Sequence, residues 1–343
     1  MKVGFIAPMS ISVVHGGVRT QAEMTIKHLR SLGVEPVMIS PWDRLDVNEL
    51  DLIHVFGATA ENSGILLHLS NSDVPVILSP ILYSNRSISV INLSIKAEKL
   101  LSVLGNGIRS EFGLKAGLCE MADLILPNTF KEGRMIEQGF GIRSSKIKMV
   151  PNGVEKRFST ADKNLFIETY GLQDFVLFVG QASAERKNVI GLIKAAEEIN
   201  AEVVIIGSFD NSAYSQKCLQ LAGQAGNITL INTLDHDSKL LSSAYAAAKV
   251  FVLPSYFETP GIAALEAGLA GANIAITKHG GTQEYFGNHA SYIDPKSTVS
   301  IVKAINKALS AKTNYRLKKH ILQNYTWEMV AQKTFDLYLE VLK

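Results

Sequence analysis

The sequence predicts an α/β protein built from two doubly wound domains that face each other across a cleft. Short apolar runs, each with the length of a buried parallel strand, alternate with helical patterns in both halves of the chain. A cluster of turn residues, VPNGV at 150–154, interrupts this alternation near the middle. The 343 residues also exceed the length that one hydrophobic core usually serves. We therefore expect a first domain at 1–157 and a second at 158–325.

The first half opens as a strand, a glycine loop and a helix. The apolar run from Val3 to Ala7 leads into a loop with His15, Gly16 and Gly17, which a helical pattern follows. Because glycine has no Cβ, Gly16 and Gly17 would let the backbone approach a ligand closely. The pair is not a Gly-x-Gly-x-x-Gly fingerprint, and the chain has no Walker phosphate loop. Further strands are expected at 37–40, 51–56, 76–79 and 124–127.

The second half repeats the same alternation. Strands are expected at 175–179, 202–207, 228–231, 250–253 and 273–277. Helices are expected at 188–199, 212–225 and 238–248 and in an Ala- and Leu-rich segment that Gly261 opens, followed by closing helices at 299–309 and 326–342. A second glycine pair stands at Gly280 and Gly281, just after the last of these strands.

The stretch from Lys249 to Gly268 carries two carboxylates in a strand, a loop and a helix. Glu258 lies in the loop, and Glu266 lies about a turn and a half inside the helix. In open α/β sheets, ligands bind outside the carboxyl ends of the strands, near helix N-termini. One carboxylate would then face a ligand at the helix mouth, and the other would hold it farther along. The alternative makes Glu258 a helix-terminal charge and Glu266 a solvated helix residue.

Two adjacent cations follow the strand predicted at 175–179. Gly180 opens that loop, and Arg186 and Lys187 precede the next helix. Guanidinium, ammonium, backbone N–H groups and the helix dipole all favour a phosphate or diphosphate, although adjacent cations in a loop can also be merely solvated. Glu258 and Glu266 add acceptors for hydroxyl groups. Together these side chains suit a ligand with phosphates at one end and hydroxyls at the other, which is the layout of a nucleotide sugar.

Composition and charge exclude several classes of function. A net charge of +2 gives no indication of nucleic-acid binding. Cys119 and Cys218 are too few and too far apart for a disulfide framework or a zinc site, so a reducing cytosol fits best. The N-terminus does not resemble a secretory signal, and no uninterrupted apolar run is long enough for a transmembrane helix.

Two further segments allow more than one interpretation. Asp235 and Asp237 resemble an Asp-x-Asp metal motif, but Asp237 directly precedes a helical pattern and is better interpreted as an N-cap, so we expect no metal. A helix predicted at 88–104 has one apolar face, which favours packing on a sheet. The alternative for the 86–118 segment, which contains Arg86, Lys96, Lys99, Arg109 and Lys115, is an amphipathic surface for a membrane or an apolar acceptor.

Four motifs of this sequence together resemble glycosyltransferase family 4. They are YFETPGIAALEAG with its two Glu residues, VPNGV, RKN and the N-terminal His-Gly-Gly. The resemblance extends along nearly the whole chain, through ADLILPNTF and GGTQEYFG to the final helix that begins YTWEMV. It implies the GT-B fold, with two Rossmann-like domains, and a final helix at 326–343 that crosses back to the first domain. It also implies transfer of a sugar from a nucleotide sugar with retention and without a required metal.

The resemblance further implies a role for each candidate site residue. Arg186 and Lys187 would hold the donor diphosphate, Glu258 would face the donor sugar, and Glu266 would hold the ribose hydroxyls. Gly180 would belong to the donor site, as would the backbone of Gly261 and Ile262, which would contact the sugar or phosphate. Gly16 and Gly17 would close on the diphosphate from the first domain.

The sequence departs from the usual family pattern in three places. Many members carry the arginine five residues before the lysine, where Ala182 stands here, whereas Arg186 adjoins Lys187. Many have Gly-Phe-Gly after the first Glu, where this chain has Thr259, Pro260 and Gly261. Many place a histidine after the strand at 76–79, where this chain continues with Pro80.

The expected function is therefore retaining sugar transfer from a nucleotide-diphosphate sugar to a hydroxyl of a glycan, a lipid-linked glycan or a small molecule. Polysaccharide biosynthesis in the cytoplasm is the expected setting, with peripheral contact at the inner face of the membrane left open. The alternatives are a catalytically silent nucleotide-sugar-binding partner of another transferase, or a phosphorylase or epimerase of the same fold. No cofactor and no nucleic-acid partner is expected.

Overall fold

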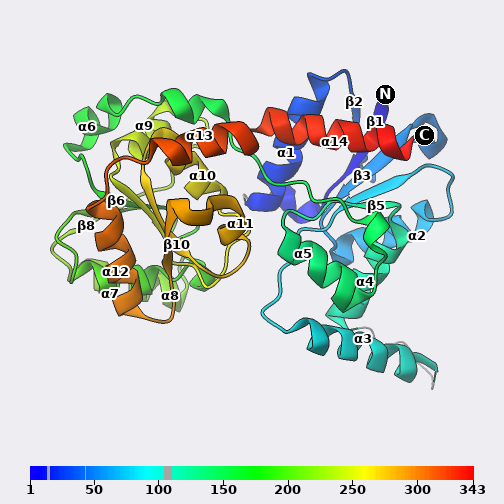
Figure 1. Ribbon diagram of the computed structural model, residues 1–343, viewed down its shortest axis with the longest axis horizontal. Coiled ribbons are helices and arrows are strands. Elements are labelled where there is room, and N and C mark those ends of the chain that lie inside the picture. The colour runs from blue at the N-terminus through cyan, green and yellow to red at the C-terminus, as the bar shows by residue number, and fades with distance from the viewer. Residues whose placement is uncertain (14–15, 43, 104–109) are drawn as a thin grey trace. The chain divides into compact units, whose positions relative to one another are not determined.

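The computed structural model describes residues 1–13, 16–42, 44–103 and 110–343 (Figure 1). His15, Arg109 and the end of the helix predicted at 88–104 lie outside these residues. The chain divides into two compact units, one formed by Met1–Gly153 with Trp327–Lys343 and the other by Val154–Thr326. Each unit is built on one parallel sheet, which confirms the predicted α/β fold class.

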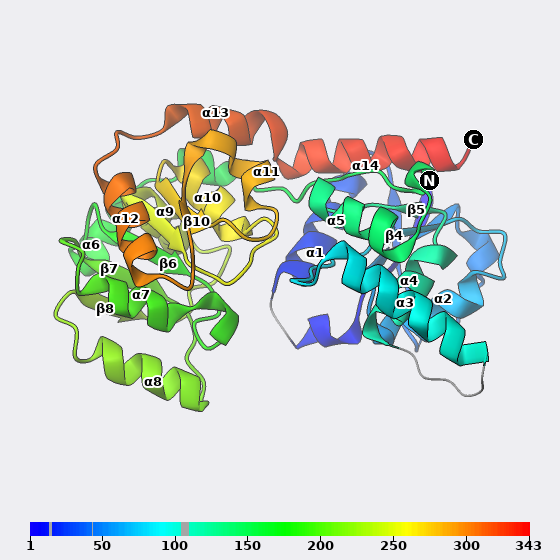
Figure 2. The same cartoon turned by 60° about the horizontal axis from the view of Figure 1, so that its bottom comes forward.

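The first unit has a sheet with the strand order β2-β1-β3-β4-β5. The strands are β1 (Lys2–Ile6), β2 (Glu35–Met38), β3 (Leu52–Phe56), β4 (Val76–Ser79) and β5 (Leu124–Ile125). The helices are α1 (Gly17–Arg30), α2 (Ser63–Leu69), α3 (Ile88–Val103), α4 (Glu111–Met121), α5 (Phe130–Arg134) and α14 (Trp327–Val341). Helices α1 and α14 pack together on one face of this sheet, while α2 and α4 cover the other (Figures 1 and 2).

The final helix is fixed to the first unit by a buried polar contact. The Tyr338 hydroxyl on α14 lies 2.5 Å from Nδ1 of His54 on β3, and the other ring nitrogen of His54 lies 2.9 Å from the hydroxyl of Ser79. Burial lowers the pKa of His54 from 6.5 to about 3, so the ring is neutral at physiological pH. A neutral ring can accept one hydrogen bond and donate another, which suits these two partners.

The second unit has a sheet with the strand order β11-β10-β9-β6-β7-β8. The strands are β6 (Val176–Val179), β7 (Val203–Ile206), β8 (Ile228–Ile231), β9 (Val250–Leu253), β10 (Asn273–Thr277) and β11 (Ala290–Ile293). The helices are α6 (Asn164–Tyr170), α7 (Val189–Ala196), α8 (Ala213–Ala222), α9 (Lys239–Ala247), α10 (Ile262–Ala270), α11 (Thr282–Phe286), α12 (Thr298–Leu309) and α13 (Tyr315–Asn324). Helices α7, α8 and α12 lie on one face of the sheet, and α6, α9, α10 and α13 on the other (Figure 1).

Both sheets are doubly wound, so each has a point where the strand order reverses. In the first unit this point lies between β1 and β3, and in the second between β6 and β9. The strands at these points, such as β6 and β9, are parallel and almost wholly buried, which explains their continuous apolar sequences. Helices leave the two strands toward opposite faces there, so the backbone opens at their carboxyl ends.

Some elements differ from those predicted. The strand expected at 37–40 lies at Glu35–Met38, because it is an edge strand and tolerates Pro36. Several elements were not predicted. Among them are β11, an edge strand with only one buried residue; α4, whose glycines hide a helical pattern; and the basic helix α13. The strand expected at 124–127 ends at Ile125.

The favoured interpretation of the helix at 88–104 is wrong. Its predicted apolar face is exposed, with Leu93 at 68% and Leu100 at 69% of full exposure. The helix packs instead through Ile91 and Ile95, which are buried against the first unit. Periodicity identified an apolar face but not the neighbour that would cover it. None of the helices in the described ranges is long and apolar enough to cross a membrane.

Candidate functional site

The predicted cations and the first carboxylate come together at the reversal point of the second sheet. Arg186 and Lys187 lie in the loop after β6, and Glu258 lies in the loop after β9. Since β6 and β9 are parallel neighbours, their carboxyl ends lie at the same edge of the sheet. Two elements distant in sequence thus place opposite charges at the position where doubly wound sheets bind ligands.

Glu258 forms a buried ion pair with Lys187. One carboxylate oxygen accepts hydrogen bonds from Lys187 Nζ at 2.6 Å and from the Ser255 hydroxyl at 2.7 Å. The Arg186 guanidinium lies 3.7 Å from the same oxygen, but its side chain is 44% exposed, whereas Glu258 is only 6% exposed. Two cations and one carboxylate give this cluster a net positive charge, and Arg186 is its most exposed member.

The charge state of Glu258 follows from these partners. Burial alone would raise the pKa of this carboxyl, but the charges of Lys187 and Arg186 and the hydrogen bonds from Lys187 and Ser255 outweigh burial and lower it. Glu258 is therefore ionised at neutral pH. A buried ion pair of this kind is costly to break because the remaining charge loses its partner.

Asn188 ties the cationic loop to the end of β9. Its buried side chain amide donates to the backbone carbonyls of Pro254 at 3.2 Å and Pro295 at 2.8 Å. Its backbone is left-handed, with φ at 55°, and it is followed at once by the first turn of α7. Asparagine is among the few residues that adopt this conformation readily, which explains why it follows Lys187. This positioning residue was part of the RKN motif but had no predicted role.

The second glycine pair fixes the backbone of Glu258. The Glu258 amide donates to the carbonyl of His279 at 3.1 Å, and Gly281 donates to the carbonyl of Glu258 at 2.9 Å. A Cβ at Gly280 would lie 1.9 Å from the Glu258 carbonyl oxygen, and its φ of 99° also favours glycine. Only glycine at 280 allows the two loops to approach this closely.

Replacing Gly280 by alanine should therefore destabilise the protein and displace Glu258. We expect a loss of about 1–3 kcal/mol in the free energy of unfolding beyond the cost of the positive φ, because the new methyl group must move the backbone. Gly171→Ala is the matched control, since Gly171 also has a positive φ of 70° but open space around it. Urea unfolding measures both variants, and equal losses would contradict the close approach.

Glu266 is held on both of its carboxylate oxygens. His236 Nε2 lies 2.8 Å from Oε1, and the Tyr245 hydroxyl donates to Oε2 at 2.8 Å. Glu266 is only 4% exposed, which excludes the alternative of a solvated helix residue. His236 and Tyr245 were not predicted as site residues, because the only signal for His236 was its position between two aspartates.

The contact with Glu266 changes the charge of His236. The hydrogen bond to Glu266 is the main cause that raises the pKa of His236 from 6.5 to about 9, against the opposing effect of burial. The imidazole is therefore largely protonated at neutral pH. The protonated ring and the neutral Tyr245 hydroxyl thus each contact one oxygen of the carboxylate. Burial raises the pKa of the Tyr245 hydroxyl well above its usual value.

This shift predicts a dependence of stability on pH. Because the folded pKa exceeds the unfolded one, the ion pair contributes its full stability below about pH 6.5 and loses it as the pH rises through about 9. Solvent screening weakens the effect, since the His236 side chain is 43% exposed. We expect the unfolding free energy to fall more steeply over this range in the native protein than in His236→Gln. Parallel pH profiles from chemical unfolding would refute the pairing.

The carboxylates near His236 are already paired with an arginine. Glu155, His236 and Asp237 offer ligand atoms within 4.8 Å of one another. However, the Arg157 guanidinium donates to Glu155 at 2.9 Å and lies 3.6 Å from Asp237. This cation compensates the negative charge, so the cluster gives no support for a metal site. The N-cap of α9 is Ser238, whose hydroxyl accepts from Leu241, so the interpretation of Asp237 as the N-cap is wrong.

The remaining predicted residues lie at helix termini or strand ends. Gly261 is the left-handed N-cap of α10, with φ at 84°, and Ile262 is the first residue of that helix. Gly180 follows β6, and a Cβ at Gly207 would lie only 2.2 Å from its carbonyl oxygen. Gly16 and Gly17 lie in the first unit, at the N-terminus of α1, where a Cβ at either would contact nothing within 4 Å. The role of these two in donor binding stays a prediction.

Parts of the chain are similar in sequence to known glycosyltransferases. Residues 165–325 match the family model of glycosyl transferases group 1. An uncharacterized glycosyltransferase of Methanocaldococcus jannaschii is 29% identical over 219 residues, which cover 58% of this chain and 55% of the relative. A D-inositol 3-phosphate glycosyltransferase of Acidothermus cellulolyticus is 25% identical, over 66% of this chain and 55% of the relative. The chain thus spans about half the length of these curated relatives.

Solved structures are similar over nearly the full chain. The sucrose-phosphate synthase of Thermosynechococcus elongatus superposes with a TM-score of 0.77 at 16% identity, covering 99% of this chain and 98% of that one. HepE of Anabaena, solved in complex with UDP-glucose, has a TM-score of 0.71 at 15% identity and covers 99% of this chain and 100% of its own. The chain therefore has the GT-B fold, and its second unit carries the match to group 1 glycosyl transferases.

Proposed function

We propose that this protein is a retaining glycosyltransferase of family 4, which moves a sugar from a nucleotide-diphosphate sugar to an acceptor hydroxyl. The observation that carries the proposal is the joining of Arg186, Lys187 and Glu258 at the reversal point of a doubly wound sheet. That sheet lies in the part of the chain that matches group 1 glycosyl transferases. Cations for phosphates and carboxylates for hydroxyls thus occur together in one unit.

The proposed roles follow from charge and exposure. Arg186, which is the more exposed cation, and Lys187 would bind the donor diphosphate, with the N-termini of α7 and α10 adding backbone N–H groups. Glu258 would hold Lys187 in place and accept a hydrogen bond from the donor sugar. Glu266 would bind the ribose hydroxyls, which would then compete with His236 for one carboxylate oxygen.

The proposed reaction needs charge stabilisation on the leaving group. The bond between the anomeric carbon and the phosphate oxygen breaks, and its electron pair leaves with the nucleoside diphosphate. The acceptor oxygen then bonds to the anomeric carbon on the same face, and the hydroxyl proton passes to the departing phosphate. Arg186 and Lys187 would stabilise the negative charge that develops on this phosphate, which is usually among the largest contributions to catalysis. The proposed reaction uses no metal.

Relatives and neighbours guide the choice of ligands. Two of them are named as a D-inositol 3-phosphate glycosyltransferase and a sucrose-phosphate synthase, and HepE was solved with UDP and with UDP-glucose. UDP and UDP-sugars are therefore the first donors to test on this chain, beside other nucleotide sugars.

A thermal-shift screen followed by a transfer assay tests the proposed function. A nucleotide sugar that binds the folded chain should raise its melting temperature by mass action. The isolated chain should then transfer or slowly hydrolyse that donor. Binding without turnover would instead indicate a silent partner of another transferase. A requirement for free phosphate would indicate a phosphorylase, and turnover of the donor without an acceptor to an isomeric sugar would indicate an epimerase.

The acceptor side of the proposal involves α3 of the first unit. Leu93 and Leu100 are exposed on this helix, with Lys96 nearby in sequence. We propose that this face supports peripheral contact with a membrane that presents a lipid-linked acceptor, at the cytoplasmic side. Co-sedimentation with vesicles of anionic and of neutral lipids tests it, and failure to bind either kind would leave a glycan or a small-molecule acceptor.

A further inference from the structure

A cavity lies at the opposite edge of the second sheet from the candidate donor site. Its volume is about 480 Å³, within the range of small-molecule sites. Asn273 and Ala290, the first residues of β10 and β11, contribute to its wall. Because all paired strands of this sheet are parallel, the cavity lies at their amino ends, whereas Arg186, Lys187 and Glu258 follow the carboxyl ends. The two sites are therefore distinct.

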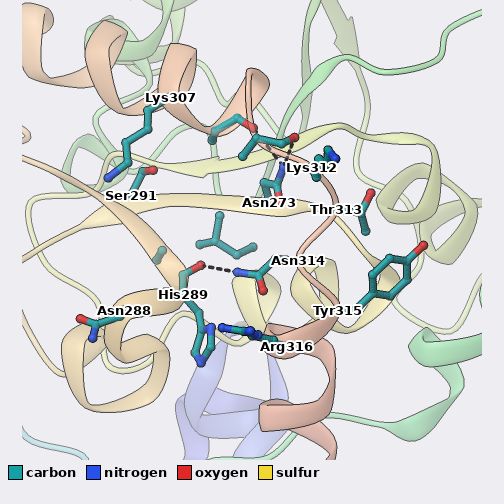
Figure 3. Close-up of a pocket in the computed structure, with 14 residues that line it drawn as sticks. Asn273, Asn288, His289, Ser291, Lys307, Lys312, Thr313, Asn314, Tyr315 and Arg316 are labelled. Carbon is teal, nitrogen blue, oxygen red and sulfur yellow. Dashed lines mark hydrogen bonds between the residues drawn. The ribbon is translucent and has the colours of Figure 1, made fainter.

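The cavity is lined by cations and contains no carboxylate among its lining residues. Lys307 comes from the last turn of α12, Lys312 from the following loop, and Arg316 from the first turn of α13. None of these three forms an ion pair in the described ranges of the chain. Figure 3 shows Lys307 extending toward Ser291 and the Arg316 guanidinium beside the ring of His289. Three positive charges from three segments thus line this cavity, and no acid lies among its lining residues.

Besides the three cations, three local features affect the electrostatics of the cavity. Helix α13 begins here with Asn314 as its N-cap, so the partly positive end of a ten-residue helix faces the same region. The pKa of His289 is lowered, first by burial and then by the charges of His320 and Arg316, so the positive charge of the cavity comes from the lysines and the arginine rather than from this ring. The carbonyls at the end of α12, which would oppose an anion, are satisfied by the side chain amide of Asn273, which donates to Ala308 at 3.0 Å and Ala311 at 3.2 Å.

From this arrangement we propose that the cavity binds a phosphorylated small molecule with hydroxyl groups, such as a sugar phosphate. Lys307, Lys312 and Arg316 hold the phosphate, because ammonium and guanidinium groups form charge-assisted hydrogen bonds with its oxygens. Asn288, Ser291 and Thr313, which also line the cavity, offer hydrogen bonds to the hydroxyls of the body of the ligand. The cavity is large enough for such a ligand and leaves Tyr315 at its exposed margin.

The position of α13 links this cavity to the candidate donor site. Leu317 and Ile321 on α13 pack against α10 at Gly268, where an added Cβ would lie 3.0 Å from each side chain. Gly268 lies two residues beyond Glu266 on the same helix. A ligand bound at the first turn of α13 therefore acts on the helix that carries the proposed ribose contact. This link, unlike the binding itself, rests on the proposed function.

Calorimetric titration tests the site directly. The full chain is titrated with glucose 6-phosphate, with glucose and with inorganic phosphate at constant ionic strength, in the presence of saturating UDP so that the donor site is occupied. We expect saturable binding of the sugar phosphate, weaker binding of inorganic phosphate and none of glucose. The double variant Lys307→Ala/Arg316→Ala should bind the sugar phosphate at least about tenfold more weakly, since it loses two of the three cations that would form charge-assisted hydrogen bonds with the phosphate.

The matched control is Lys303→Ala, which removes a cation one turn earlier on α12 that does not line the cavity. It should bind like the native protein, and circular dichroism confirms that all variants are folded. Equal binding by the double variant and the native protein would overturn the site, as would the absence of saturable binding. An unchanged UDP affinity when the cavity is saturated would overturn the link through α13, while failure of UDP and of every other nucleoside diphosphate to bind would instead count against the proposed function.

Discussion

Replacing Lys187 by alanine is expected to lower kcat by about 10²–10³ with a defined donor and acceptor. The reason is that the ammonium group would stabilise the charge that develops on the leaving phosphate, and one well-placed donor of this kind contributes about 3–4 kcal/mol in other enzymes. The KM for the donor should change less than kcat, because the interaction strengthens in the transition state. Steady-state kinetics over a range of donor concentrations separates the two parameters.

The same substitution also removes the partner of a buried carboxylate, so stability must be measured beside activity. The double variant Lys187→Met/Glu258→Gln removes both charges, and we expect it to unfold at nearly the native temperature while its kcat stays strongly reduced. Lys194→Ala, an exposed lysine on α7, is the surface control. A folded double variant with normal kcat would show that the pair is only structural.

Replacing Glu266 by alanine is expected to raise the Kd for a nucleoside diphosphate by about 10- to 100-fold. A carboxylate that accepts from two ribose hydroxyls forms charged hydrogen bonds of about 1.5–3 kcal/mol each, partly offset because His236 must yield one oxygen. Both the ground state and the transition state would lose these contacts, so kcat at saturating donor should fall much less. Isothermal calorimetry with UDP and with the other nucleoside diphosphates measures the affinity.

Two variants separate the ribose contact from the support of Glu266. Tyr245→Phe removes one hydrogen bond to the carboxylate but leaves its charge, so it should weaken nucleotide binding only slightly. Glu266→Gln keeps the shape and removes the charge, and it should give an intermediate loss. If Tyr245→Phe weakened binding as much as Glu266→Ala, the carboxylate would be important only for the local structure.

The alternation of strands and helices was predictable because both unit cores follow simple periodicities. Continuous apolar runs at 250–253 and 273–277 mark buried parallel strands, and both match the structure to the residue. Edge elements were less predictable: β11 has one buried residue, and Pro36 on β2 disguised a strand that tolerates it. The exposure of the apolar face of α3 was not predictable either, since periodicity identifies such a face but not the neighbour that would cover it.

The candidate site was predicted as residues but not as contacts. Lys187 and Glu258 were assigned separate tasks, whereas the structure pairs them across 71 positions of sequence. The contact depends on the order β9-β6, which no local pattern encodes. The close approach of Gly280 to Glu258 and the hydrogen bond between His236 and Glu266 likewise join segments that are distant in sequence. Asp237 and Ser238 are both good capping residues, so only the backbone geometry selects Ser238.

The stereochemistry of transfer tests the central proposal most directly. A donor identified by thermal shift is incubated with the native chain and an acceptor, and proton NMR follows the anomeric signal of the first product before it can equilibrate. Retaining transfer predicts a product with the same anomeric configuration as the donor, together with release of the nucleoside diphosphate. A product of inverted configuration would contradict the proposed mechanism.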